Sequence, residues 1–345
     1  MYNVFLRALR DRYPDAQICM AAGSLLIQAL PKFLRTHTYI QDLFEYPDSG
    51  VGSLRAKLAL VAKLRSRRFD LCVVEDLAEW RAFHGFLCGI PHRIGIARNP
   101  LDRLYMTHQV TIEATRDEPP DLLDMSQSWA RACGAALCSD VEDLPPWFPF
   151  TIDHQLPVHL PPPIVAVHVG GHASWNRRWP LEHFRQLCGK ICLAGASVYL
   201  VGGGDDEAEA ERVRCGVVAS HRDANIANLT GGSLNTVANY LAHATVFVGN
   251  DSAPMHIAAG LRKPVIVLTG PSNPRLWKRL YRATCITSGE CDHLDASPNR
   301  HQLAQVSCEK HRCPYRFDPK NPRYPLCMLN LSVESVWKAV RPHLV

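Results

Sequence analysis

The feature that most constrains the fold is a regular alternation of short apolar segments with amphipathic segments of helical length. In the second half of the chain the apolar runs are residues 164–169, 197–201, 245–248 and 264–269, and the helical patterns are residues 181–193, 206–220, 234–241 and 254–261. Strands that are apolar along their whole length and alternate with helices form parallel sheets covered on both faces. The pattern therefore predicts an α/β fold of doubly wound, Rossmann-like type, whose ligands bind beyond the carboxyl ends of the strands.

A proline-rich segment divides the chain. Seven prolines lie between Pro145 and Pro163, a density that excludes a helix or a central strand and stiffens the chain. We therefore expect a first domain over residues 1–150, a linker over residues 151–163 and a second domain over residues 164–345. Strand and helix patterns also alternate before the linker, so we expect two Rossmann-like domains that face each other across a cleft.

Composition and charge exclude several classes of protein. The net charge is +5 over 345 residues, too small an excess for a dedicated nucleic-acid binder, although it suits an anionic small molecule or membrane face. No apolar run reaches the roughly 18–20 residues of a membrane span. Arg7, Arg10 and Arg12 stand where a signal peptide would be apolar, and most cysteines occur singly in apolar segments, as in a reducing compartment. We expect a cytoplasmic protein.

Residues 244–274 form the strongest candidate for a ligand site. A predicted strand is followed by the polar turn Asn250, Asp251 and Ser252, and then by a helix of small residues with Pro254 in its first turn. Backbone N–H groups and a helix dipole at the carboxyl end of a strand bind diphosphates or sugar hydroxyls. The alternative is that the polar residues only cap the helix. Because capping accounts for one polar residue better than for several, the pattern favours ligand binding.

A second candidate loop follows the predicted strand 164–169. Gly170 and Gly171 allow close approach of the backbone to a ligand, and Arg177 or Arg178 can make a charge-assisted contact with a phosphate. The alternative is that the two arginines form a solvated basic patch.

A third candidate loop runs over residues 202–207, from Gly202 onward. Its glycines do not fit the G-x-G-x-x-G motif, and its acidic residues indicate a helix N-terminus rather than a metal site.

Several stretches carry a resemblance to a known family. They are GGHASWNRRWPLEHF, YLVGGGDDE, the segment over residues 228–274, and CEKHRCPYRF near the C-terminus. They resemble glycosyltransferase family 9, the lipopolysaccharide heptosyltransferases, and LRALRDRYPDAQI near the start extends the resemblance over nearly the whole chain. It implies a GT-B architecture and transfer of heptose, with inversion, from an ADP-sugar to a lipopolysaccharide core or other glycan acceptor. The protein would act at the cytoplasmic face of the inner membrane, with peripheral membrane contact.

The resemblance also implies roles for individual residues. The donor-binding residues would be Gly170, Gly171, His172, Ser174, Arg177, Gly202, Asp251, Ser252, Ala253 and His256. Among them, Arg177 would neutralise the leaving ADP, since a cation placed where negative charge develops stabilises the transition state. The chain contains no D-x-D triplet, so we expect transfer without a metal.

The catalytic base is expected outside these segments. The family implies an aspartate in a Gly-Asp pair at the end of the first strand, and no such pair precedes Val4. We therefore expect the first sheet to lack a strand and the base to lie before Met1. Two alternatives stay open: a catalytically inactive nucleotide-sugar binding homologue, and a sugar-nucleotide epimerase of GT-B fold.

Four cysteines near the C-terminus leave one further alternative open. Cys291, Cys308, Cys313 and Cys327 are separated by 16, 4 and 13 residues, whereas compact zinc sites contain C-x₂₋₄-C pairs. A structural zinc or iron at these cysteines is one interpretation. The resemblance favours buried structural thiols, because it implies cysteines in this region without a need for a metal.

Overall fold

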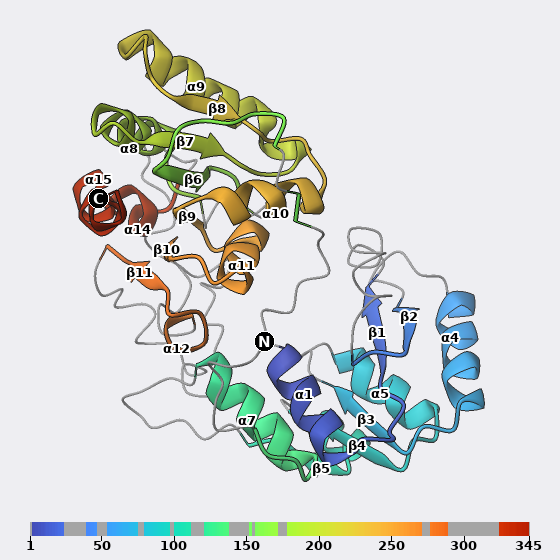
Figure 1. The fold of residues 1–345 in the computed structure, drawn as a ribbon. Helices are drawn as coiled ribbons and strands as arrows, with labels where there is room; N and C mark the ends of the chain where they lie inside the picture. Colours follow the sequence, from blue (N-terminus) through green and yellow to red (C-terminus); the bar gives the residue numbers. More distant parts are fainter. Residues whose placement is uncertain are drawn as a thin grey trace. The chain divides into compact units, whose positions relative to one another are not determined.

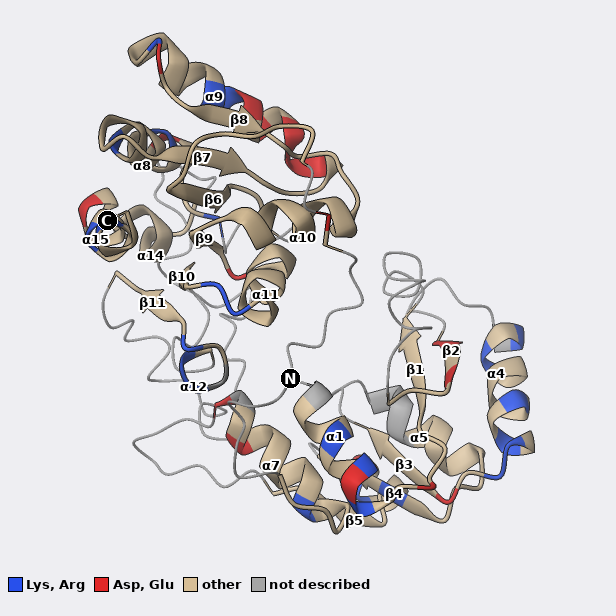
Figure 2. Cartoon of the chain, in the orientation of Figure 1, with Lys and Arg blue, Asp and Glu red and all other residues tan. Residues whose placement is uncertain are grey.

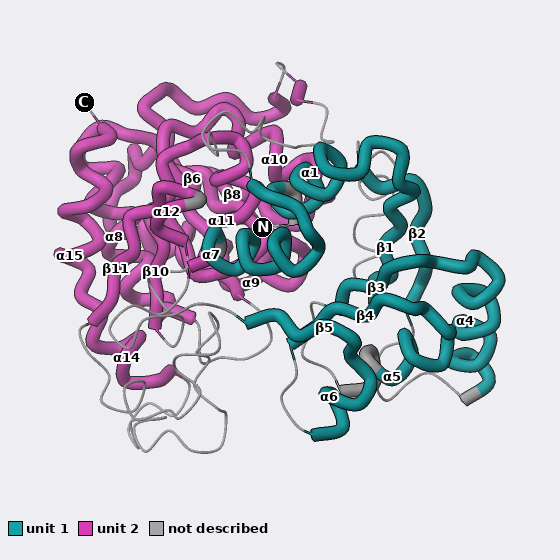
Figure 3. Tube along the Cα trace, turned by 90° about the horizontal axis from the view of Figure 1, so that it is seen from below, with its two compact units in different colours: residues 1–113, 123–144 teal, residues 114–122, 145–345 magenta. Residues whose placement is uncertain are grey.

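The computed structural model describes the greater part of the chain, as two units. The described residues are 2–23, 39–46, 54–74, 79–96, 100–111, 121–137, 152–153, 156–171, 178–270, 277–288 and 324–344. One unit comprises residues 1–113 and 123–144, and the other comprises residues 114–122 and 145–345 (Figure 3).

The second unit is built on a six-stranded parallel sheet (Figure 1). Its strands are β6 (Ile164–His168), β7 (Ser197–Leu200), β8 (Ile226–Asn228), β9 (Val246–Asn250), β10 (Val265–Leu268) and β11 (Thr284–Ile286). The strand order is β11-β10-β9-β6-β7-β8, with Val165 of β6 opposite both Val198 of β7 and Val246 of β9. The chain therefore builds the sheet outward from β6 in one direction and from β9 in the other. The boundary between β6 and β9 is the topological switch point, where doubly wound sheets bind their ligands.

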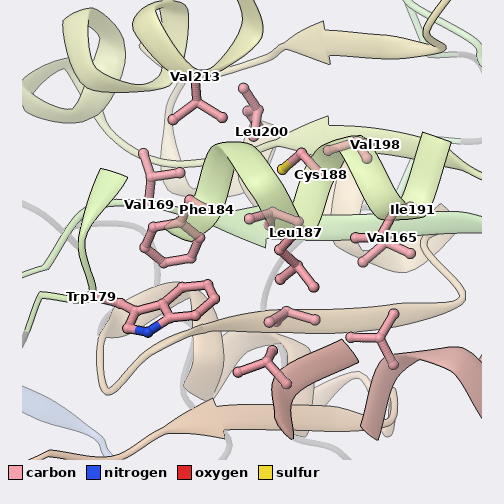
Figure 4. Packing of buried hydrophobic residues seen from close by; sticks show 14 of the residues in the cluster. Val165, Val169, Trp179, Phe184, Leu187, Cys188, Ile191, Val198, Leu200 and Val213 are labelled. Carbon is pink, nitrogen blue, oxygen red and sulfur yellow. The ribbon is translucent and has the colours of Figure 1, made fainter. Parts of the chain in front are cut away.

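Helices cover both faces of this sheet. They are α8 (Leu181–Leu193), α9 (Glu207–Ser220), α10 (Leu234–His243), α11 (Ala253–Gly260), α12 (Lys278–Tyr281), α14 (Leu326–Leu329) and α15 (Val333–Val340), with single 3₁₀ turns η3 (Gly204–Asp206) and η4 (Arg341–His343). Val165, Val198 and Val246 pack into one core with residues of α8, α9 and α15 (Figure 4). On the other face, the Tyr199 ring meets Tyr240 of α10 with centroids 5.5 Å apart. Burial on both sides explains why the middle residues of β6, β7 and β9 are apolar or aromatic on both faces of the sheet.

The C-terminal segment is anchored to the same core. The Trp179 side chain is fully buried, its Nε1 donates to the Leu331 carbonyl oxygen at 2.8 Å, and its ring meets Phe184 edge-on with centroids 4.9 Å apart (Figure 4). Val336 and Val340 of α15 are also fully buried in this cluster. A buried aliphatic or aromatic side chain of this kind contributes about 1.5–3 kcal/mol.

The first unit contains two smaller parallel sheets. Its elements are α1 (Tyr2–Arg12), β1 (Cys19–Gly23), β2 (Asp42–Tyr46), α4 (Leu54–Ser66), β3 (Leu71–Val74), α5 (Glu79–Leu87), β4 (His92–Gly95), α6 (Pro100–Tyr105), β5 (His108–Gln109) and most of α7 (Leu122–Ala132). β1 pairs with β2, and β3, β4 and β5 form the second sheet. Phe5 and Leu9 of α1 pack with Trp129 of α7 and Ile94 of β4. Among the described residues, no strand joins β1 to β3.

The predicted fold class is confirmed. The predicted runs 164–169 and 245–248 correspond to β6 and β9, and the helical pattern 181–193 to α8. β8 and β11 were not predicted, because runs of three residues at sheet edges are too short to show a period. None of the described helices is long and apolar enough to cross a membrane.

The observed units differ from the expected boundaries, since residues 114–122 and 145–150 fall in the second unit. Part of the predicted linker is bonded to β7 of that unit: the Leu160 N–H donates to the Tyr199 hydroxyl at 3.1 Å, and Ser197 Oγ donates to the Pro161 carbonyl oxygen at 2.5 Å.

We expect the amide hydrogens of β6 and β9 to exchange with solvent more slowly than those of β1 and β3. β6 and β9 are buried and paired on both sides, whereas among the described residues β1 and β3 each have one paired edge. Exchange slows where local opening must break more buried contacts. Hydrogen–deuterium exchange followed by mass spectrometry measures this, and equal protection of all four strands would contradict it.

Candidate functional site

Three polar side chains meet at the carboxyl ends of the central strands. Ser252, which follows β9, has its Oγ 2.9 Å from Nδ1 of His168, the last residue of β6. Nε2 of His168 lies 3.2 Å from Oδ2 of Asp206, in the loop after β7. The His168 and Asp206 side chains are 3% and 12% exposed. This buried chain of hydrogen bonds therefore lies beside the switch point between β6 and β9.

The Asp206 carboxylate fills space left by two glycines. A Cβ at Gly170 would lie 1.7 Å from Asp206 Oδ1, and a Cβ at Gly202 would lie 2.5 Å from Oδ2. The Gly203 N–H donates to Oδ2 at 3.0 Å. Burial by itself raises the pKa of Asp206. The hydrogen bonds from His168 and Gly203 and the nearby charges lower the pKa by a larger amount, so the pKa lies below its usual value. Gly170 was predicted to let a ligand approach the backbone and Gly202 to bind the donor, and here both make room for this carboxylate.

Asn250 ties the β6 loop to the end of β9. Its side chain is fully buried, its Oδ1 accepts from the Trp179 N–H at 3.1 Å, and its Nδ2 donates to the Gly170 carbonyl oxygen at 2.7 Å. The two ends of an amide group thus satisfy a donor and an acceptor of the neighbouring loop. Sequence analysis placed Asn250 in the ligand-binding turn but did not assign it this role.

Arg178 is held in the same loop. Its Nη1 donates to Oε2 of Glu209 in α9 at 2.9 Å, and its Nη2 donates to the Gly171 carbonyl oxygen at 2.8 Å. The two charged side chains are each 12% exposed. The alternative that both arginines are solvated is therefore wrong for Arg178.

The Ser252 hydroxyl does not cap the helix that it precedes. Ser252 is the N-cap residue of α11, yet its side chain accepts no hydrogen bond from the first turn. Its Oγ instead lies within hydrogen-bonding distance of His168 Nδ1 and of the Asn250 carbonyl oxygen, at 2.9 and 3.1 Å. The capping interpretation is therefore wrong for Ser252. Ala253 is an exposed residue. Because Pro254 has no N–H, the N–H of Ala253 is a main-chain donor that the start of this helix can offer a ligand.

A second polar group is formed by side chains of α11 and α12. His256 Nδ1 is 3.0 Å from the Tyr281 hydroxyl, and the Trp277 ring stacks on Tyr281 with centroids 5.5 Å apart. Burial lowers the pKa of His256, opposed by the charge of Asp251, and burial raises the pKa of Tyr281. Tyr281 therefore keeps its proton, and its hydroxyl can donate a hydrogen bond to Nδ1 of a neutral His256. In that tautomer Nε2 carries the ring proton and is a donor.

Other predicted site residues lie outside the described residues. These are His172, Ser174 and Arg177 of the loop after β6, and Cys291, Cys308 and Cys313 of the proposed metal site. Cys327 lies in α14, beside Gly270. Within the described ranges, no group of three or more His, Cys, Asp or Glu side chains is arranged to hold a metal ion.

The contributions of His168, Asp206, Glu209 and Tyr281 were missed by sequence analysis. Asp206 was assigned to a helix N-terminus, and it is indeed the residue before α9. The signal that could have found these residues is their position, since His168 and Asp206 both follow strands that meet at one edge of the sheet.

The two α/β units define a GT-B glycosyltransferase fold, and the comparisons with known proteins specify it. The sequence profile of glycosyltransferase family 9 (heptosyltransferase) matches residues 58–308, and the chain belongs to this family.

Named relatives and solved structures agree with this assignment. Lipooligosaccharide heptosyltransferase 2 of Haemophilus influenzae is 34% identical over 294 residues, covering 80% of this chain and 80% of the relative. Lipopolysaccharide heptosyltransferase 2 of Escherichia coli is 26% identical over 286 residues, and the match covers 79% of this chain and 80% of the relative. Two E. coli structures share the fold. ADP-heptose lps heptosyltransferase II has a TM-score of 0.65 and 20% sequence identity, and the match covers 99% of this chain and 93% of that one. Heptosyltransferase WaaC with ADP-2-deoxy-2-fluoro heptose has a TM-score of 0.64 and 15% identity, and the match covers 99% of this chain and 95% of that one.

We expect Gly170→Ala to destabilise the protein by about 1–3 kcal/mol, the usual range for overpacking, because its Cβ would overlap Asp206. Gly203→Ala is the matched control. No atom lies within 4 Å of its Cβ and its φ is −80°, so its effect should stay within about 0.5 kcal/mol. Urea denaturation measures both, and equal losses would show that Asp206 does not impose the glycine at position 170.

We also expect the free energy of unfolding to fall as the pH drops below about 6.5, the ordinary histidine pKa. The lowered pKa of His256 means that the unfolded chain takes up a proton in this range while the native protein does not, so acid favours unfolding. The free energy of unfolding should fall less between pH 7 and pH 5 in His256→Gln than in the parent protein. Exchange of the exposed His92 for Gln should leave this fall unchanged. Denaturation at both pH values tests this, and an unchanged loss in His256→Gln would refute it.

Proposed function

We propose that the protein transfers a heptose-type sugar, with inversion, from an ADP-sugar to a lipopolysaccharide core or a related glycan acceptor. Membership of the family and the names of its relatives support the reaction class. The observation that carries the proposal is the turn from Asn250 to Ala253, which follows the central strand β9 and begins α11. Main-chain N–H groups and a helix dipole at a switch point favour a diphosphate.

The donor would be bound from both ends of this turn. Asp251, Ser252 and Ala253 would contact the sugar and the diphosphate, and the neutral His256 would donate from Nε2 to a sugar oxygen without adding charge. Gly171 would border the phosphates, while Gly170 and Gly202 would act indirectly by accommodating Asp206.

The leaving group would be stabilised from the loop after β6. His172 and Ser174 would line the phosphates, and Arg177 would neutralise the charge that develops on ADP as the glycosidic bond breaks. Arg178, already paired with Glu209, would hold this loop in place. Because the chain has no D-x-D triplet, cationic and N–H groups would perform the task that a metal performs in other glycosyltransferases.

The acceptor and an anionic membrane face would be bound by the first unit. α4 carries Arg55, Lys57, Lys63 and Arg65 and no acidic residue (Figure 2), and Leu58 on the same helix is 55% exposed. A basic helix with exposed apolar side chains suits peripheral contact with anionic lipid at the cytoplasmic face of the inner membrane.

A second candidate function is binding of a nucleotide sugar without turnover. A transfer assay with ADP-heptose and a heptose-deficient lipopolysaccharide acceptor separates the two functions, since both bind donor but only the enzyme releases ADP.

We expect the full-length protein to bind ADP in the presence of EDTA, with a Kd in the range of about 1 μM to 1 mM that is usual for substrates. Arg177→Ala should weaken binding about tenfold or more, the value of a charge-assisted contact. Arg214→Ala, which removes an arginine paired with Glu211 on the surface of α9, is the control and should bind like the parent. Isothermal titration calorimetry measures all three.

Three results would overturn the donor assignment. They are a requirement for a divalent cation, tighter binding of UDP or GDP than of ADP, and an equal loss of affinity in Arg177→Ala and Arg214→Ala.

A further inference from the structure

In the buried chain from Asp206 through His168 to Ser252, the carboxylate and the imidazole have no direct task in the transfer reaction as proposed. The chain joins the loop after β7, the end of β6 and the residue that precedes α11. The ring of His168 is 3% exposed, so a ligand does not reach it directly. Its two nitrogens are nevertheless both engaged, one by a carboxylate and one by a hydroxyl at the candidate site.

The chemistry of the partners fixes the protons. An ionised carboxylate can only accept, so Nε2 of His168 carries the proton that is shared with Asp206. The lowered pKa of Asp206 keeps that carboxylate ionised. When the ring is neutral, Nδ1 is then an acceptor, and the Ser252 hydroxyl can donate to it or to the Asn250 carbonyl oxygen. Both acceptors lie inside the protein, so the hydroxyl proton of Ser252 points away from a ligand.

The backbone at Ser252 depends on these contacts. Ser252 is extended, with φ −159° and ψ 171°, and the next residue begins α11. Pro254 cannot donate, and the Met255 N–H donates to the Ser252 carbonyl oxygen at 3.1 Å. The direction of the Ala253 N–H therefore follows from the conformation of the Ser252 residue, whose side chain is held by His168.

We propose that His168, oriented by Asp206, is a positioning residue that fixes Ser252 so that the main-chain donors at the start of α11 are aligned for the donor diphosphate. The inference rests on the proposed function, because it assigns a role at the same ADP site. The hydroxyl of Ser252 contributes by its inward bond, and the N–H groups beside it contact the ligand.

Two substitutions of His168 separate its two bonds. In His168→Gln the amide lies near the position of Nε2, so it can donate to Asp206 but offers nothing to Ser252. In His168→Asn the side-chain oxygen lies near the position of Nδ1, so it can accept from Ser252. Ser252→Ala removes the hydroxyl and Ser252→Thr keeps it. Ser197→Ala is the structural control, since it removes the buried hydroxyl that β7 bonds to Pro161, at the amino end of the strand.

ADP affinity of the full-length variants is measured by calorimetry, with thermal unfolding in parallel. We expect His168→Gln and Ser252→Ala each to weaken ADP binding about threefold to tenfold, the value of one lost hydrogen bond. His168→Asn and Ser252→Thr should stay within about twofold of the parent. The double variant His168→Gln/Ser252→Ala should bind no more weakly than either single variant, because both remove the same interaction. Ser197→Ala should unfold at a lower temperature with unchanged affinity.

A purely structural role predicts a different pattern. If losses of affinity add in the double variant, or if His168→Gln binds ADP like the parent, the positioning role is wrong. A parent protein that binds no ADP would instead overturn the proposed function, and with it this inference. Nitrogen-15 spectra of the labelled histidines identify the protonated ring nitrogen of His168: a proton on Nε2 alone supports the assignment, and one on Nδ1 alone overturns it.

Discussion

The candidate site depends on one buried carboxylate. Asp206 lies in a space that exists because Gly170 and Gly202 have no side chains, and it is stabilised as an anion by the Gly203 N–H and His168. A buried charge is costly unless it is hydrogen-bonded. The three loops that supply its neighbours must therefore keep their relative positions, and those loops carry the predicted donor-binding residues.

The hydrophobic core of the second unit holds the loops around Asp206 in position. Strands β6, β7 and β9 are fully buried and locked in parallel register, and helices cover both faces. Asn250 extends the pairing beyond the end of β9 by bonding to Gly170 and to Trp179. Trp179 in turn is bonded to Leu331, so the C-terminal segment and the candidate site are fixed by the same packing. A site built on rigid strand ends needs little reorganisation when it binds an anion.

Much of the second unit could be predicted from its sequence. Apolar runs of four to six residues between helical patterns identified β6, β7, β9 and β10. The turn after β9 was predicted to be a ligand site because polar residues follow a buried strand there. The first unit was less predictable. β5 spans two residues and β1 pairs with β2 alone among the described residues, so the local periodicity that identifies a strand is weak.

The sequence by itself determined the fold class and the family, and it predicted which loops form the candidate site, because strand and helix periods and turn residues are local properties. What each polar residue in those loops does was decided by the tertiary structure. Ser252 had the sequence context of a cap and Gly170 that of a ligand-binding glycine, yet the first bonds to His168, 84 residues away, and the second makes room for Asp206. Arg178 had the context of a solvated patch and is paired with Glu209, 31 residues away. Partners so distant in the chain meet because parallel strands bring their carboxyl ends to one edge, and no local pattern records which side chains then face one another.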